Sequence, residues 1–190
     1  MFGATEGVIQ TSVGYAGGIK KHPTYQDLGD HTEVVRVIYD PTEIDYKQLL
    51  SIFRNNHNPS MHYQRQYWSI ILYTSEKQLI SAQECLQFLE KASSSTIHTK
   101  LVPFEKFIPA ESYHQKYILQ THPWMIVAVN VQSAKELIES QICTKLNGFL
   151  AGYGRIDEFF EVGKRLGLNE KMITYVSNEL KKSAVHTELL

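Results

Sequence analysis

Cysteine is scarce in this sequence: the 190 residues contain two, Cys85 and Cys143. Two cysteines are too few for a disulfide framework, and they lack the spacing of metal ligands. No apolar run reaches the length of a membrane-spanning helix, and the longest, Met125 to Val131, fits a strand or part of a buried helix. We therefore expect a soluble protein of a reducing compartment, the cytoplasm by default, with no metal ion and no cofactor.

An excess of charge of one sign is also missing, because the chain has 19 Lys and Arg residues and 20 Asp and Glu residues. This balance excludes the basic surface of a nucleic-acid-binding protein, although the pairs Lys20-Lys21 and Lys181-Lys182 are present. The first seven residues have neither the basic nor the apolar part of a secretory signal. Neither nucleic acid nor a membrane is an expected partner.

Apolar residues make up 43% of the chain, which is enough for one sizeable core with an appendage. Hydrophobic periodicity and turn residues predict strands and helices in mixed order up to about Pro123, and helices only from Ser133 onward. This order favours a two-layer α+β domain followed by a helical region. Residues 7–18 are predicted to form a short strand that runs into a glycine-containing loop, and further strands are predicted over 31–39, 69–73 and 99–103. The predicted helices cover 45–56, 76–92, 134–146, 156–166 and 170–182.

Glu33 is a candidate for acid–base chemistry because it lies in phase with Val35, Val37 and Tyr39 along a predicted strand. If that side of the strand is partly buried, burial disfavours the ionised carboxylate and prepares Glu33 to donate a proton. The alternative is a solvated glutamate at the end of a strand, which is the commoner case for this residue type.

Aromatic and histidine side chains add further candidates. Tyr25 and Tyr67 lie in predicted loops, where their hydroxyls could donate hydrogen bonds to a ligand oxygen, although tyrosines in such places are more often packing residues. His114 could be a site histidine, but a histidine that bonds the backbone at a helix start is commoner. Tyr15 could line an apolar pocket or belong to the core.

Several motifs occur together in the order found in one protein family. They are Gly7-Val-Ile-Gln-Thr-Ser-Val-Gly-Tyr-Ala-Gly-Gly18, Pro23-Thr24-Tyr25, Gly29-Asp-His-Thr-Glu33, Asn56-His57, Gln66-Tyr67 and Pro109-Ala-Glu-Ser-Tyr-His-Gln-Lys-Tyr117. On these residues the chain resembles peptide methionine sulfoxide reductase A from about Phe2 to Gln120. The segment Lys145-Leu-Asn-Gly-Phe-Leu-Ala-Gly152 is similar to an extension of an insect-type branch of that family.

The resemblance implies a fold and a domain division. It implies a ferredoxin-like two-layer sandwich over residues 1–122, incomplete at its N-terminal strand, and a helical extension over 123–190. It also implies reduction of methionine-S-sulfoxide, free or in proteins, to methionine during protein repair, with thioredoxin as the partner of an intact form.

The resemblance further implies roles for individual residues. In the family a cysteine thiolate attacks the sulfoxide sulfur, while a glutamic acid and two tyrosines bind and protonate the departing oxygen. By motif position Glu33 corresponds to the acid, and Tyr25 and Tyr67 correspond to the tyrosines. Residues expected to contact the substrate are Tyr15, Gly17, Gly18, His31 and His114.

The sequence departs from the family pattern in three places. The Gly-Cys-Phe-Trp-Gly element that carries the nucleophile does not precede the Gly7 segment, and the resolving cysteines near the C-terminus are not visible. The acidic residue that the family has shortly before Gln-Tyr has no match in Met61 to Arg65. Cys85 and Cys143 fit inert core thiols better than substitutes for the nucleophile.

From these departures we expect an N-terminally truncated chain that is inactive as written. Loss of a covalent nucleophile can lower turnover by a factor on the order of 10⁶. Two alternatives stay open: a non-catalytic module that binds methionine sulfoxide or regulates, and a chain in which Cys143 has become the nucleophile.

Overall fold

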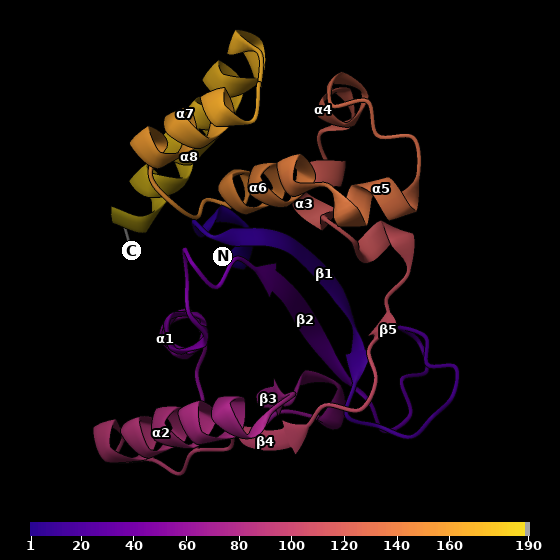
Figure 1. The fold of residues 1–190 in the computed structure, drawn as a ribbon, viewed down its shortest axis with the longest axis vertical. Coiled ribbons are helices and arrows are strands. Elements are labelled where there is room, and N and C mark those ends of the chain that lie inside the picture. The colour runs from indigo at the N-terminus through magenta and orange to yellow at the C-terminus, as the bar shows by residue number, and fades with distance from the viewer. Residues whose placement is uncertain (189–190) are drawn as a thin grey trace. The chain divides into compact units, whose positions relative to one another are not determined.

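The computed structural model of the protein describes residues 1–188 and confirms the α+β class, with a helical C-terminal region (Figure 1). The last two residues of the predicted helical extension, 189–190, lie outside the described residues. The strands are β1 (Val8–Ala16), β2 (Thr32–Tyr39), β3 (Ile70–Tyr73), β4 (Lys100–Pro103) and β5 (Ile108–Pro109). The α-helices are α1 (Tyr46–Asn55), α2 (Glu76–Ala92), α3 (Tyr117–Gln120), α4 (Pro123–Ala128), α5 (Ala134–Glu139), α6 (Gln141–Leu150), α7 (Ile156–Arg165) and α8 (Glu170–Glu188). The 3-10 helices are η1 (Phe2–Ala4), η2 (Arg65–Tyr67) and η3 (Ser112–His114).

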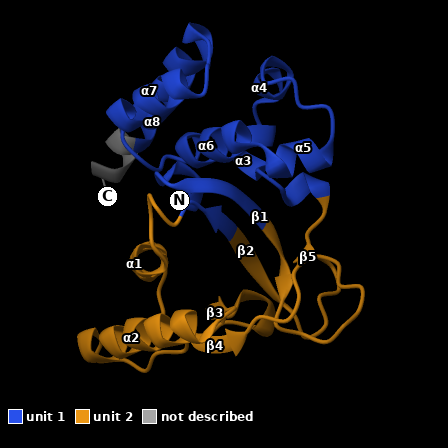
Figure 2. Ribbon diagram, viewed as in Figure 1, with its two compact units in different colours: residues 1–12, 37–40, 112–190 blue, residues 13–36, 41–111 orange. Residues whose placement is uncertain are grey.

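The chain divides into two compact units, which Figure 2 shows in different colours. Unit 1 consists of residues 1–12, 37–40 and 112–190, and unit 2 of residues 13–36 and 41–111. Strands β1 and β2 each contribute residues to both units. The predicted domain boundary between residues 122 and 123 stays a prediction.

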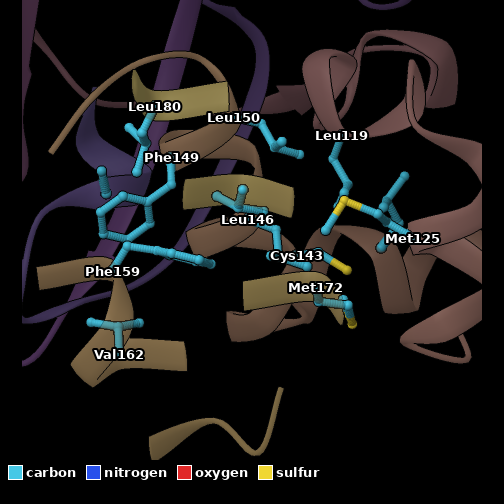
Figure 3. Close-up of a cluster of buried hydrophobic side chains, with 13 residues drawn as sticks. Leu119, Met125, Cys143, Leu146, Phe149, Leu150, Phe159, Val162, Met172 and Leu180 are labelled. Atoms are coloured by element: carbon cyan, nitrogen blue, oxygen red, sulfur yellow. The ribbon is translucent and has the colours of Figure 1, made fainter. Parts of the chain in front are cut away.

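Unit 1 has a core of apolar side chains from its helices (Figure 3). Leu146 and Phe149 of α6 lie at its centre, and the Phe149 ring centroid lies 4.9 Å from that of Phe159 on α7. Lys145 is also buried, and its Nζ donates a hydrogen bond to the Thr5 carbonyl at 2.5 Å. Burial lowers the pKa of Lys145 to about 8. A buried cation held by a carbonyl thus joins α6 to the start of the chain.

Unit 2 contains strand β3, which pairs in parallel with β4, and helices α1 and α2. Both helices begin where the sequence predicts. The Asp45 carboxylate accepts from the Gln48 amide at 2.8 Å, and the Ser75 hydroxyl accepts from the Gln78 amide at 3.3 Å. The strands form two sheets by hydrogen bonding, a three-stranded one in the order β2-β1-β5 and the β3-β4 pair.

The structure corrects two details of the predicted elements. The single helix predicted over 134–146 is wrong, because Ser140 ends α5 and its hydroxyl caps α6 by accepting from the Cys143 amide at 3.1 Å. Strand β5 lies in a segment predicted to be a loop, and Gly14 and Tyr15 of β1 pair with its two residues. A two-residue strand that ends in proline is too short to show the alternation of apolar and polar residues by which strands are predicted.

The apolar run near Met125 is settled in favour of helix, since α4 begins at Pro123 and buries Met125. Among the described residues, none of the helices is long and apolar enough to cross a membrane.

Substitution of Gly148 tests the contact between α6 and η1. A Cβ at Gly148 would lie 2.2 Å from the Ala4 nitrogen and 2.6 Å from the Gly3 carbonyl carbon. Because these are backbone atoms that cannot turn aside, we expect Gly148→Ala to lower the free energy of unfolding by about 1–3 kcal/mol in urea denaturation. This loss would oppose the usual helical gain of about 0.5–1 kcal/mol from replacing glycine by alanine.

The matched control is Gly163→Ala on α7, where a Cβ would meet side chains only and would lie 3.2 Å from Cγ1 of Ile173. We expect that variant to unfold at an equal or higher urea concentration than the parent protein. Equal behaviour of the two variants would contradict a close backbone contact at Gly148.

Candidate active site

Tyr25 lies at the tip of a tight turn in the loop between β1 and β2. Thr24 and Asp27 exchange backbone hydrogen bonds of 3.2 and 3.0 Å, which closes the turn around Tyr25. Lys20 holds the other side of the turn, because its Nζ forms an ion pair with Asp27 and donates to the Asp27 carbonyl at 3.0 Å. The hydrogen bond from Lys20 and its charge lower the pKa of Asp27. The turn thereby presents Tyr25 with 40% of its surface exposed.

The Glu111 carboxylate holds the backbone of Tyr25. Its Oε1 accepts a hydrogen bond from the Tyr25 amide at 3.0 Å, and its Oε2 accepts from the Tyr15 hydroxyl at 2.6 Å. Tyr15 is 2% exposed and packs with Leu28 and Ala110. One carboxylate therefore links the Tyr25 turn to a buried tyrosine of β1.

Glu33 lies near the start of β2 and is half-buried. The Gln66 side-chain amide donates to Glu33 Oε1 at 2.6 Å. This bond holds the carboxyl group through Oε1. Among residues 1–188, Oε2 of the same carboxyl group takes part in no hydrogen bond or ion pair. The prediction that this side of the strand is partly buried is confirmed at Glu33, Val37 and Tyr39. It is wrong at Val35, which is exposed in the middle of the strand.

Tyr67 ends the 3-10 helix η2 and is 49% exposed. A hydrogen bond with the Tyr25 side chain raises the pKa of Tyr67, and the nearby Glu33 charge raises it further. A raised pKa keeps the phenol protonated, so that it stays a hydrogen-bond donor. Tyr25 and Tyr67 thus share a hydrogen bond in unit 2, and Glu33 lies near enough for its charge to act on Tyr67.

The loop that carries Tyr25 is closed at its base by His31 and Asp30. His31 is buried; its Nδ1 accepts from the Gly18 amide at 3.2 Å, and its Nε2 lies 2.9 Å from the Lys20 carbonyl. Because Nδ1 accepts from an amide, the donor to the carbonyl is Nε2–H of a neutral ring. Asp30 accepts from the Ile19 amide at 2.9 Å, which lowers the pKa of Asp30.

These contacts show how the other predicted substrate-contacting residues lie. Tyr15 and His31 are buried behind the loop as its supports, and Gly17 and Gly18 contribute backbone groups to the hydrogen bonds at its base. His114 belongs to unit 1, where its ring centroid lies 4.2 Å from that of Tyr113. Direct contact of these five residues with a substrate stays a prediction.

Glu111, Gln66 and Arg65 take part in this arrangement, although sequence reasoning assigned no role to any of them. Glu111 and Gln66 belong to motifs that carry the resemblance, and this membership is the sequence feature that could have indicated a role for them. Arg65 donates to the carbonyls of Asp30 and Gly17, two segments that are distant in sequence, and no local pattern indicates such contacts.

The two cysteines are buried. Cys85 packs in the unit 2 core with Leu50 and Ala82, and Cys143 lies in the unit 1 core. Burial is the main reason that the pKa of each thiol is raised. A raised pKa and low exposure make a thiol a poor nucleophile. Among residues 1–188 no group of three or more His, Cys, Asp and Glu side chains is arranged to hold a metal ion.

Most of the chain is similar in sequence to known proteins. The model of the family described as peptide methionine sulfoxide reductase matches residues 1–146. A peptide methionine sulfoxide reductase of Drosophila melanogaster is 44% identical over 178 residues, which are 92% of this chain and 72% of that protein. Peptide methionine sulfoxide reductase A5 of Arabidopsis thaliana is 38% identical over 157 residues, 79% of this chain. The chain spans 62% of that relative's length.

A solved structure is similar as well. Methionine sulfoxide reductase A of Corynebacterium diphtheriae aligns with a TM-score of 0.59 and 31% identity. The alignment covers 64% of this chain and 68% of that one.

Titration of Tyr67 tests the contact between the three side chains. Because the hydrogen bond with Tyr25 is the main cause of the raised pKa of Tyr67, we expect Tyr25→Phe to lower this pKa toward the ordinary tyrosine value. Glu33→Gln should lower it by a smaller amount, since it removes only a nearby negative charge. The measurement is a pH titration of tyrosine Cζ resonances by NMR, with Tyr67 assigned from Tyr67→Phe.

The control variant is Tyr63→Phe, another exposed tyrosine of unit 2. It should leave the titration of Tyr67 unchanged. If Tyr25→Phe also left it unchanged, the two phenols would not be in contact.

Proposed function

Because the chain belongs to the peptide methionine sulfoxide reductase family, we propose that Glu33, Tyr25 and Tyr67 bind the oxygen of methionine-S-sulfoxide, free or in oxidised proteins. The family reduces methionine sulfoxide to methionine in protein repair, which is an oxidoreductase reaction. The observation that carries the proposal is the hydrogen bond between two phenols in unit 2 with the Glu33 carboxyl group, held by Gln66, near them.

The chemistry of the ligand matches these three groups. A sulfoxide oxygen is a strong hydrogen-bond acceptor, and the protonated phenols of Tyr25 and Tyr67 are donors. The oxygen leaves only when it receives a proton, and a positioned acid typically contributes about 10²–10⁴-fold to such a step. With Oε1 of Glu33 held by Gln66, we assign the proton to Oε2. Glu33 is thus the proton donor of the proposed site.

The sulfur-attacking thiolate is the remaining requirement of the family's reaction. Cys85 and Cys143 are buried and have raised pKa values, which supports neither as the nucleophile. The 190 residues contain no Gly-Cys-Phe-Trp-Gly element. We propose that neither of these thiols attacks the sulfoxide sulfur, and that the family's reaction takes place in the cytoplasm with electrons from thioredoxin.

A second candidate function is a non-catalytic module that recognises oxidised methionine. The proximity of Glu33, Tyr25 and Tyr67, together with two buried thiols, favours it. Reductase activity of this chain that Cys143→Ser abolished would instead identify Cys143 as the nucleophile. Activity that survived Cys143→Ser would exclude that role.

Binding of a small sulfoxide tests the proposed function. The probe is N-acetyl-methionine-S-sulfoxide N-methylamide, titrated into the full chain and followed by calorimetry or NMR. We expect saturable binding that Glu33→Ala abolishes and Tyr67→Phe weakens by about tenfold, the loss expected for one hydrogen bond. Glu33→Gln, which keeps a polar group, should bind more tightly than Glu33→Ala.

Two ligands and one variant serve as controls. The sulfide N-acetyl-methionine N-methylamide has no oxygen to bind, and the R-sulfoxide presents its oxygen with the opposite hand, so both should bind more weakly. Tyr63→Phe should bind like the parent protein. Absence of S-sulfoxide binding at millimolar concentration would remove both the reductase and the recognition module from consideration.

A further inference from the structure

Arg65 connects two segments of the candidate site through its guanidinium group. Its Nε donates to the Asp30 carbonyl at 2.8 Å, and its Nη2 donates to the Gly17 carbonyl at 3.0 Å. Gly17 directly follows β1, and Asp30 lies just before β2. A single side chain therefore holds together the two ends of the loop that carries Tyr25.

The backbone of Arg65 makes a third connection. Its carbonyl accepts a hydrogen bond from the hydroxyl of Thr32 at 2.9 Å, and Thr32 is buried. Thr32 immediately precedes Glu33, and Arg65 is two residues before Tyr67 in the 3-10 helix η2. The contacts of Arg65 thus connect the acid to this phenol, in addition to the hydrogen bond from Gln66 to Glu33.

The Trp68 ring supports the arginine. The Arg65 guanidinium lies 4.2 Å from the centroid of this ring, and Lys100 of β4 lies 3.2 Å from it. Among residues 1–188 no carboxylate forms an ion pair with Arg65, so its contacts are two carbonyl oxygens and an aromatic ring. These contacts suit a planar, delocalised cation that donates in two directions at once, whereas the ammonium of lysine is a point charge that cannot reproduce them.

We infer that Arg65 is a positioning residue, which sets Glu33 and Tyr67 at the spacing that a sulfoxide oxygen requires. The inference rests on the proposed function for its ligand but on geometry alone for the positioning. Arg65 does not contact the oxygen itself; it acts through the strand start at Thr32 and the 3-10 helix that ends at Tyr67. A change at Arg65 should therefore alter the contact between the phenols before any ligand is present.

The test compares Arg65→Gln and Arg65→Lys with the matched control Arg54→Gln. Arg54 is a second arginine of unit 2 that lies over an aromatic ring, 4.0 Å from the Phe88 centroid. Its guanidinium donates hydrogen bonds to Ser51 and Asn55, which are both on its own helix. Three quantities are measured on the full chain: the midpoint of thermal unfolding, the pKa of Tyr67 by NMR titration of its Cζ resonance, and the affinity for N-acetyl-methionine-S-sulfoxide N-methylamide.

We expect both Arg65 variants to lower the pKa of Tyr67 toward the ordinary tyrosine value and to weaken sulfoxide binding by at least about tenfold. Arg54→Gln should leave both quantities unchanged, even where its unfolding midpoint falls as far as that of Arg65→Gln. Should Arg65→Gln fail to fold, Arg65→Lys, which keeps the charge and most of the stem, decides the test.

The inference is overturned if a folded Arg65 variant titrates at Tyr67 and binds sulfoxide like the parent protein. A parent protein that does not bind the sulfoxide contradicts the proposed function, whereas the Tyr67 titration still decides the positioning role. A loss of thermal stability with an unchanged Tyr67 pKa would make Arg65 a structural residue only.

Discussion

The candidate site depends on side-chain hydrogen bonds that hold the loop between β1 and β2. Apart from one backbone pairing at the Tyr25 turn, this loop has little regular structure to satisfy its backbone groups. Asp30 and His31 accept from amides at its base, and Glu111 accepts from the Tyr25 amide. Because buried or constrained polar groups need partners, the loop adopts the conformation in which these acceptors are used.

From this constraint follows a division between supporting and reacting groups. The supports, His31 and Tyr15 above all, are buried and have their polar atoms engaged. The groups assigned to the ligand, Tyr25 and Tyr67, remain substantially exposed and touch each other. A site of this kind is preorganised, since its donors are in place before the ligand arrives. All of these residues lie in unit 2, so the geometry of the site is set within that unit.

The sequence predicted the elements whose signals are local. A run rich in β-branched residues that stops before Pro41 predicted β2, apolar spacing predicted α1, and the cap at Ser75 predicted the start of α2. It missed β5, because a two-residue strand exists only through its pairing with β1, and it missed the break at Ser140, because apolar spacing continues across it. The motifs indicated Glu33, Tyr25 and Tyr67, but the contacts of Arg65 join positions far apart in the chain and required the structure.

The central claim is that a sulfoxide oxygen binds between the Glu33 carboxyl group and the phenols of Tyr25 and Tyr67. A crystal structure of the full chain with bound N-acetyl-methionine-S-sulfoxide N-methylamide tests it most directly. We expect the sulfoxide oxygen within hydrogen-bond distance of Glu33 and of at least one of the two phenols, with Gln66 still bonded to Glu33. A sulfoxide bound elsewhere, or one whose oxygen points away from all three side chains, would contradict it.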